Sequence, residues 1–314
     1  MAEAGHVPVM ADEVVEYLAP RRDGVYVDCT LGAGGHSLRV AETMGTGRIY
    51  GCDKDPEALA QAQAALARVP EIKLESWQGD FAEARAHWGL EQVDGVIADL
   101  GLSSMQLRAG ARGFSFTADG PLDMRMDPRQ ELTAEQVVNQ FDERTLADLI
   151  FQYGEERRSR RIARAIVRSR PLRSTRQLAE LVAAAAGTMK PGRRAGIHPA
   201  TRTFQALRIY VNQELRSLAA LLAALPGWLR PGGRAVIIAF HSLEDRPVKQ
   251  SFRAGARQGW YELLTPHAVR PRAEEVAHNP RARSARLRAV RRHQSAGVAP
   301  AGLPLAGRAA GNGG

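Results

Sequence analysis

The chain has 314 residues, 44% of them hydrophobic and 25% charged, with a formal net charge of +9 and a pI near 10.1. This is the composition of an ordinary globular protein, and it excludes a fully disordered chain. No apolar run approaches the ~18 residues of a membrane span, and the N-terminus lacks the charged-then-apolar pattern of a secretion signal, so we expect a cytoplasmic protein with no membrane partner. The excess positive charge predicts a polyanionic partner and says nothing about the fold.

Predicted strands and helices alternate over the first third of the chain. Asp12 is expected to cap a short helix, and the first apolar strand follows at Val25. Further apolar runs lie at 49–52, 72–77 and 93–98. This alternation predicts an α/β fold in which a parallel, Rossmann-like sheet has helices on both faces.

Three predicted strand ends carry the residues of a candidate nucleotide site. The first strand runs into the glycine turn Gly32-Ala-Gly34-Gly35-His36-Ser37. The second ends in Asp53, about twenty residues on, where an acid can accept both hydroxyls of a ribose. The run at 93–98 ends in Asp99, so we expect all three ends to meet at one crevice. Cys29 and Cys52 fall in predicted buried strands and are expected to be small apolar core residues.

The glycine spacing helps to choose a cofactor. A dinucleotide loop has the pattern G-x-G-x-x-G, but this chain has Ser37 in place of the third glycine, and the loop lacks the lysine of a P-loop. S-adenosylmethionine has no phosphate; it needs backbone clearance, a ribose acceptor and an apolar wall for adenine. Asp80 and Phe81, after the third strand, can supply an amine acceptor and that wall. The residues therefore favour a methyl-donor site and leave a dehydrogenase as an alternative.

The pattern changes after Ser104. Residues 107–199 show no convincing strand and read as helices punctuated by glycine and proline, which predicts an inserted helical domain. An amphipathic helix from Thr203 precedes a returning strand at 235–240. We expect three parts: a discontinuous methyltransferase domain at 1–106 and 200–293, a helical substrate-recognition domain at 107–199, and a disordered tail at 294–314.

The last part of the chain has weaker signals. The runs at 262–264 and 287–290 predict a terminal antiparallel pair of strands. The tail is rich in alanine, glycine and proline and lacks the large apolar groups that folding requires.

Two groups of arginines are candidates for phosphate contacts. A run of charge is most often a solvated face, but together with the +9 total we interpret both groups as contacts to a nucleic acid. The first group lies on one face of a predicted helix and the second near the C-terminus: Arg157, Arg161, Arg164 and Arg168; Arg281, Arg283, Arg286 and Arg288.

Other residues are candidates for contact with a nucleic-acid base. Phe114 and Phe116 lie in a glycine-punctuated loop, where an aromatic ring can stack on an extruded base or belong to the core of the inserted domain; the sequence does not separate the two. His241 and Ser242 follow the strand at 235–240 and are expected to face the crevice.

Several long stretches of the chain resemble one family, the 16S ribosomal RNA (cytosine-N4)-methyltransferases, also called RsmH or MraW. The matching stretches span nearly everything from His6 to Arg288. They are Gly34-Gly-His36-Ser37, Asp99-Leu-Gly-Leu-Ser-Ser104 with Gln106, Arg112-Gly-Phe-Ser-Phe116, Asp119-Gly-Pro-Leu-Asp-Met-Arg-Met-Asp-Pro128, Tyr153-Gly-Glu-Glu156, His198-Pro-Ala-Thr-Arg-Thr-Phe-Gln-Ala-Leu-Arg208, Phe240-His-Ser-Leu-Glu-Asp-Arg246 and Asn279-Pro-Arg-Ala-Arg-Ser284.

The resemblance implies methyl transfer from S-adenosylmethionine to the exocyclic N4 amine of a cytosine in the decoding region of 16S ribosomal RNA. The small ribosomal subunit would be the partner, and the oligomeric state stays open, a homodimer included. The cofactor contacts that the resemblance implies are Gly34, Gly35, His36, Asp53, Phe81, Asp99 and Gln106. From the residues alone, His36 also fits a helix-start residue that binds a backbone carbonyl, and Gln106 a solvated loop amide.

The chemistry at a cytosine amine singles out Asp99. The N4 lone pair is delocalised into the ring, so an enzyme must orient it and accept a proton as charge develops. Asp99 is the best-placed candidate for that catalytic role, and a purely cofactor-binding role remains the alternative. Methylation at C5 would need a cysteine nucleophile after the fourth strand, where the chain has none. No Cys/His cluster has zinc-ligand spacing, so no catalytic metal is expected.

Two further functions stay open at this point. A DNA amino-methyltransferase would use the same crevice, although the chain lacks the Pro-Pro-aromatic turn that such enzymes often carry. A ribosome-assembly protein with a vestigial cofactor pocket is the non-enzymatic alternative.

Overall fold

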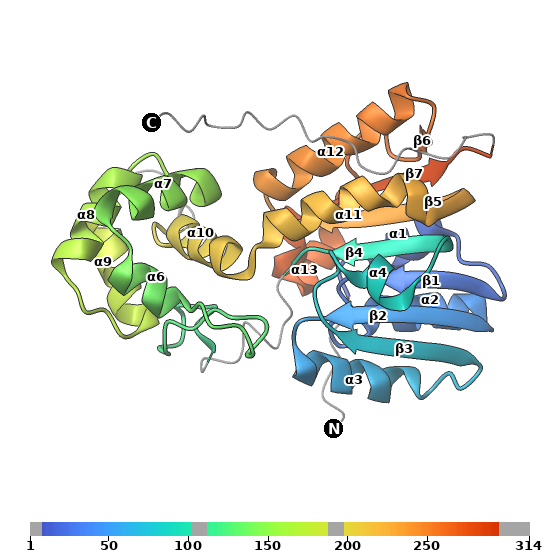
Figure 1. The fold of residues 1–314 in the computed structure, drawn as a ribbon, viewed down its shortest axis with the longest axis horizontal. Helices are drawn as coiled ribbons and strands as arrows, with labels where there is room; N and C mark the ends of the chain where they lie inside the picture. Colours follow the sequence, from blue (N-terminus) through green and yellow to red (C-terminus); the bar gives the residue numbers. More distant parts are fainter. Residues whose placement is uncertain (1–7, 102–111, 188–197, 295–314) are drawn as a thin grey trace. The chain divides into compact units, whose positions relative to one another are not determined.

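The structure, a computed structural model, describes residues 8–101, 112–187 and 198–294 (Figure 1). The chain forms two compact units: the first comprises residues 1–101 and 215–314, and the second comprises residues 102–214. These boundaries differ from the expected ones at 106 and 199. Helix α10 (Thr201–Asn212) belongs to the second unit because its apolar face packs in that unit's core.

The first unit is built on a seven-stranded sheet of order β3-β2-β1-β4-β5-β7-β6. The two strands at the C-terminal edge are antiparallel, and Leu263 of β6 pairs with Val290 of β7, which confirms the predicted terminal pair. The fifth strand begins at residue 229, earlier than predicted, so it includes the Pro231-Gly-Gly segment that was expected to be a turn. The register with β4 shifts at this segment. The strands are β1 (Gly24–Asp28), β2 (Gly47–Asp53), β3 (Ile72–Gln78), β4 (Val93–Asp99), β5 (Leu229–Ala239), β6 (Tyr261–Leu263) and β7 (Arg286–Arg292).

Helices cover both faces of this sheet, as the alternation predicted (Figure 1). Helices α1 (Ala11–Leu18), α2 (Gly35–Met44) and α3 (Pro56–Leu66) pack on one face. The other face carries α4 (Ala84–Trp88), α11 (Glu214–Trp228) and α12 (Ser242–Arg257). A short helix, α13 (Ala273–His278), and a 3-10 turn, η2 (Pro280–Ser284), precede β7.

Two smaller predictions for this unit have different outcomes. Cys29 and Cys52 are buried free thiols in the core, which confirms their interpretation as apolar residues. The cap assigned to Asp12 is wrong: Met10 is the N-cap residue of α1, and Asp12 lies in the first helical turn, where it accepts a hydrogen bond from Arg39. An acid in the first turn still favours the helix, because it faces the positive end of the helix dipole.

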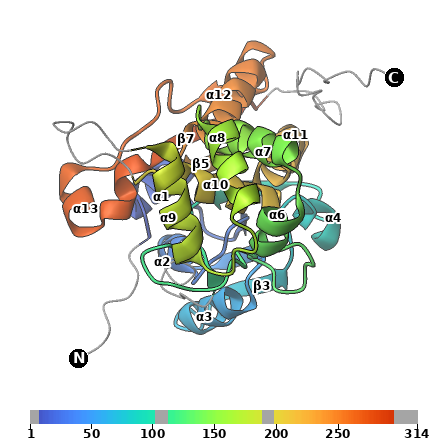
Figure 2. The ribbon, with the colours of Figure 1, turned by 90° about the vertical axis from the view of Figure 1, so that its left-hand side faces the viewer.

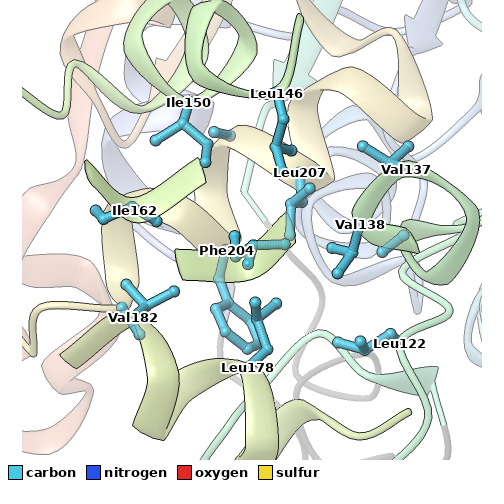
Figure 3. Packing of buried hydrophobic residues seen from close by; sticks show 14 of the residues in the cluster. Leu122, Val137, Val138, Leu146, Ile150, Ile162, Leu178, Val182, Phe204 and Leu207 are labelled. Carbon is cyan, nitrogen blue, oxygen red and sulfur yellow. The ribbon is translucent and has the colours of Figure 1, made fainter. Parts of the chain in front are cut away.

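The second unit is helical in its described residues (Figure 2). Thr133, Asp142 and Ser174 each accept a hydrogen bond from a first-turn backbone N–H group, and they fix the starts of three helices. Leucine, isoleucine and valine side chains from every helix meet in one core (Figure 3). The helices are α6 (Ala134–Gln140), α7 (Glu143–Gly154), α8 (Ser159–Arg168), α9 (Thr175–Ala186) and α10. No helix within the described parts of either unit is long and apolar enough to cross a membrane.

Candidate functional site

The candidate site lies where three parallel strands of the first unit end side by side. Residues of β1 pair with β2 on one side and with β4 on the other, and Asp28 lies opposite Gly51 and Ile97. The carboxyl ends of the three strands therefore meet at one edge of the sheet, as predicted, and Asp28, which was not predicted, lies there with Asp53 and Asp99. Ligands of open α/β sheets bind outside this edge.

The glycine turn after β1 is shaped by its neighbours. The Gly32 N–H group donates a hydrogen bond to Asp53 Oδ2 at 2.8 Å, and Gly32 has a positive φ of 52°. Gly34 has a φ of 81°, and a Cβ there would lie 2.9 Å from Leu66 Cδ1 and 3.0 Å from Ala62 Cα. The lack of space for a Cβ atom at Gly34 is independent of any ligand, because α3 passes too close to this backbone for a side chain. Gly35 opens α2.

Ser37, which replaces the third glycine of a dinucleotide loop, has a structural role that the sequence did not reveal. Its buried hydroxyl donates to Asp28 Oδ2 at 2.7 Å, so the start of α2 is tied to the end of β1. Burial raises the pKa of Asp28, and the hydrogen bond from Ser37 opposes this effect without cancelling it.

Asp53 has the geometry of a diol acceptor. Its Oδ2 accepts from Gly32, and its Oδ1 accepts from the Asp55 N–H group at 2.9 Å. A carboxylate has about four acceptor sites, so about two remain for the two hydroxyls of a ribose. Burial outweighs these hydrogen bonds and raises the pKa of Asp53 to about 6.

Asp99 is held by His36, a contact that the sequence did not predict. His36 Nε2 lies 3.3 Å from Asp99 Oδ2, and His36 is only 6% exposed. The imidazole is thus bound to a carboxylate and not to the backbone carbonyl that the alternative interpretation named. Burial by itself lowers the pKa of His36, but the hydrogen bond and charge of Asp99, together with Asp28 and Glu275, raise it overall. His36 thus positions the Asp99 carboxylate at the end of β4.

The loop that carries Phe81 leaves β3 beside the end of β2. The Gly79 N–H group donates to the carbonyl of Asp53 at 3.0 Å, which fixes this loop next to the diol acceptor. Phe81 is partly buried and packs against the core of the α4–α11–α12 face. Asp80 pairs with Lys54 Nζ at 2.8 Å and also binds the Ser217 hydroxyl, so its charge is already compensated.

The residues after β5 lie at the same edge. Asp99 pairs with Ile238, so His241 and Ser242 follow directly beyond the neighbouring strand end. His241 is the N-cap residue of α12, and its Nε2 lies 2.9 Å from Glu244 Oε1. Glu244 also accepts a hydrogen bond from the Phe240 N–H group at 2.8 Å. His241 is therefore fixed by its own helix.

The C-terminal arginine group divides into two pairs with different surroundings. Arg288 is 8% exposed and binds Asp245 at 2.6 Å, and Arg286 contacts the same carboxylate at 3.1 Å. Their interpretation as phosphate contacts is wrong, because both project from an internal strand onto an acid of α12. Arg281 and Arg283 are exposed in η2. Because β7 begins opposite Ala239, η2 lies at the edge that carries Asp99.

The two loop aromatics lie in the second unit. Phe114 is 7% exposed within the helical core, and the Arg112 guanidinium lies 5.7 Å from its ring centroid, so stacking on a base is excluded for it. Gly113, with a φ of 69°, makes the turn that directs this segment inward. Phe116 is half-buried against His198 and Phe204, at ring distances of 4.7 and 4.9 Å.

Two remaining predictions concern Gln106 and metal ions. Gln106 lies outside the described residues. Within 8–101, 112–187 and 198–294, no group of three or more His, Cys, Asp or Glu side chains is arranged to hold a metal ion.

Comparison with known proteins agrees with the sequence motifs. The model of the MraW methylase family matches residues 3–293. A relative from Koribacter versatilis, named ribosomal RNA small subunit methyltransferase H, is 54% identical over 294 residues, with 91% of this chain and 94% of the relative covered. A protein of the same name from Acidobacterium capsulatum is 53% identical over 299 residues, with 92% and 99% covered. This chain belongs to the MraW methylase family.

Proposed function

We propose that the protein transfers a methyl group from S-adenosylmethionine to the exocyclic N4 amine of a cytosine in the decoding region of 16S ribosomal RNA. The proposal depends most on one observation, the ionisable carboxylate of Asp99 held by His36 beside the glycine turn and Asp53. The names of the relatives support ribosomal RNA as the substrate. A ribosomal substrate supports a cytoplasmic location.

The residues at the strand ends fit S-adenosylmethionine better than a dinucleotide. Asp53 has acceptor sites left for a ribose, and Phe81, in the loop that Gly79 joins to Asp53, can offer a flat apolar surface for adenine. Gly34 and Gly35 supply the backbone of the turn, while Ser37 fills the place where a pyrophosphate-binding loop has glycine. Asp99 can pair with the ammonium group of the methionine moiety.

When bound, the cofactor supplies an electrophilic methyl group on a positive sulfur. The protein must then hold the N4 amine in line and accept its proton as charge develops. Asp99 is the acceptor that the geometry supports, and His36 positions it through Nε2. Burial raises the pKa of the Cys29 and Cys52 thiols well above the usual value, so neither offers a thiolate for attack at the ring and methylation of C5.

Arg281 and Arg283 support an RNA substrate at this edge. Both are exposed one short turn before β7, and Arg side chains bind phosphates with paired donors. They are the members of the C-terminal group that remain candidates for substrate contact, together with His241 and Ser242.

Product analysis tests the proposal directly. The purified protein is incubated with small ribosomal subunits and isotopically labelled S-adenosylmethionine, and the digested RNA is separated by mass spectrometry. We expect label in N4-methylcytidine at one position of the decoding region, and far less label in the same time with the Asp99→Asn variant. Label in 5-methylcytidine, or transfer to DNA in preference to RNA, would refute the assignment. Cofactor binding without any transfer would favour the assembly-protein alternative.

A further inference from the structure

Charge is strongly segregated within the second unit. Between Glu156 and Glu180 the sequence has no acidic residue. The same segment contains nine arginines: Arg157, Arg158, Arg160, Arg161, Arg164, Arg168, Arg170, Arg173 and Arg176.

Two of these arginines have structural roles. The Arg158 guanidinium donates to the carbonyl of Ala186, and that of Arg170 donates to the carbonyls of Val138 and Phe141. These bonds tie helix ends of the unit together. A third arginine, Arg164, lies 3.2 Å from Glu143 at the surface.

The outer face of α8 consists of arginine. The helix turns Ile162, Ala163 and Ile166 into the core, and Figure 3 shows Ile162 among the packed side chains. Because this packing fixes the rotation of the helix, its opposite face must remain outside. Every exposed residue of α8 is an arginine: Arg160, Arg161, Arg164 and Arg168.

The stability of the helix does not account for this face. Like charges four residues apart repel each other and destabilise a helix, and within α8 the pairs Arg160/Arg164 and Arg164/Arg168 have that spacing. A phosphate backbone would supply counter-charges for this face. The stripe from Arg160 to Arg168 is about 12 Å long at 1.5 Å per helical residue, long enough to contact more than one phosphate.

We propose that this arginine face, defined as Arg157, Arg160, Arg161, Arg164 and Arg168, binds the phosphate backbone of the RNA substrate outside the methyl-transfer site. The proposal rests on ribosomal RNA being the substrate. RNA fits the face better than a protein does, because the centre of a protein interface is apolar and depleted of charge. Its five members carry charge and no apolar centre, and guanidinium groups match phosphates with paired hydrogen bonds.

Salt-dependent binding tests the proposal. Arg157, Arg161 and Arg168 are replaced together by glutamine, which removes three charges from the face and leaves the Arg164–Glu143 pair intact. A matched control replaces Arg48, Arg68 and Lys73 by glutamine. These residues are exposed near the amino ends of β2 and β3, at the edge of the sheet opposite the candidate site. Affinity for a decoding-region RNA fragment is measured by fluorescence anisotropy across a series of KCl concentrations.

We expect the log–log salt slope to fall by about two in the face variant, because each lost contact to single-stranded RNA removes about 0.7. At 0.1 M salt this corresponds to roughly a hundred-fold weaker binding. The KM for RNA should rise while kcat at saturating RNA stays unchanged, and the control should bind like the wild type.

Two results would overturn the proposal. The first is a face variant whose slope and affinity do not differ from those of the control, and equal weakening of both would indicate general charge attraction. A loss seen with whole subunits but not with naked RNA would assign the face to an acidic ribosomal protein. A wild type that binds the RNA but places no label on cytosine N4 contradicts the proposed reaction and leaves the face intact, so the two failures are distinguishable. Circular dichroism of the variant confirms that α8 stays folded.

Discussion

Asp53 titrates within the range where cofactor binding is measured. Its pKa is raised to about 6 by burial, above the unfolded value near 3.9. The ligand-free protein therefore loses the contribution of this group to stability as the pH rises from about 4 to about 6. The ribose hydroxyls must donate to the carboxylate, so the ionised form is the one that binds.

We predict that the affinity for S-adenosylmethionine falls below pH 6, by about tenfold from pH 6 to pH 5 at most, since one proton must be released. Calorimetric titration between pH 5 and 7 measures this dependence. Asp53→Asn should bind more weakly at pH 7 and show a flat profile over the same range. A wild-type profile as flat as that of the variant would contradict the role of Asp53.

Asp99 is tested by separating binding from transfer. Asp99→Asn nearly preserves size but removes the charge that faces His36. If Asp99 accepts the amine proton, the single-turnover rate at saturating cofactor should fall by roughly 10²–10⁴-fold. A purely cofactor-binding role would instead raise the Kd for S-adenosylmethionine and leave that rate near the wild-type value. A variant with both quantities unchanged would remove Asp99 from the site.

At the scale of residues, the sequence predicted which residues end the strands better than it predicted which side chains contact each other. Asp53 and Asp99 could be placed because a strand and the acid that ends it are neighbours in the chain. The contact of His36 with Asp99 joins residues 63 positions apart, and only the pairing of β1 with β4 brings them together. Phe114 could not be assigned because the direction of a loop side chain depends on the packing around it.

In the turn between β1 and α2, Gly34 is the glycine whose Cβ position is blocked by α3. At Gly34 a side chain would meet both a positive φ and the close backbone of α3, whereas Gly89, at a φ of 61°, has nothing within 4 Å of its Cβ position. We predict that Gly89→Ala lowers the free energy of unfolding by about 1–2 kcal/mol, the cost of the left-handed backbone alone. Gly34→Ala should cost more than Gly89→Ala and weaken cofactor binding as well. Urea unfolding measures the loss in free energy of unfolding for both variants. Equal losses would show that α3 moves away from the new side chain at no cost in stability.

The exposed arginines of η2 give a prediction about the substrate. Replacing Arg281 and Arg283 with glutamine should raise the KM for RNA and lower its salt slope by about 1.4, with two contacts at about 0.7 each. The Kd for S-adenosylmethionine should stay unchanged, because these residues are separate from the glycine turn and Asp53. Steady-state kinetics at several salt concentrations, with calorimetry as the control, measures both. An unchanged slope would make the pair ordinary surface residues.

At the scale of elements, the position of β7 explains why Arg286 and Arg288 were not surface residues of one arginine patch. A cluster in the sequence is a surface patch only if its element exposes all of its members. Strand β7 lies between β5 and β6, so Arg286 and Arg288 fall inside the sheet and bind Asp245. In α8 the helical period separates the arginines from Ile162 and Ile166, and that pattern was visible in the sequence.

At the scale of the whole molecule, the two units have separate cores. The amphipathic face of α10 was recognised from the sequence, but an apolar stripe does not reveal which core it enters, so the boundary at 199 was misplaced. The structure packs Phe204 and Leu207 with Leu146 and Ile150 of α7 (Figure 3). The chain passes into the second unit at 101/102 and returns at 214/215.

Separate cores predict separate responses to mutation and to ligand. Leu146→Ala leaves a cavity in the second core and should lower local stability by about 2–5 kcal/mol, so hydrogen exchange should accelerate in α6–α10 and stay unchanged in β1–β4. Leu221→Ala, in the core under α11, should produce the reverse pattern. S-adenosylmethionine at a hundred times its Kd adds about 2.7 kcal/mol to the unit that binds it, and protection should rise at β1, β2 and β4. Mass spectrometry of deuterium uptake resolves these segments. Equal acceleration across both units in either variant would show that they unfold together, and that a defect in the helical core reaches the methyl-transfer site.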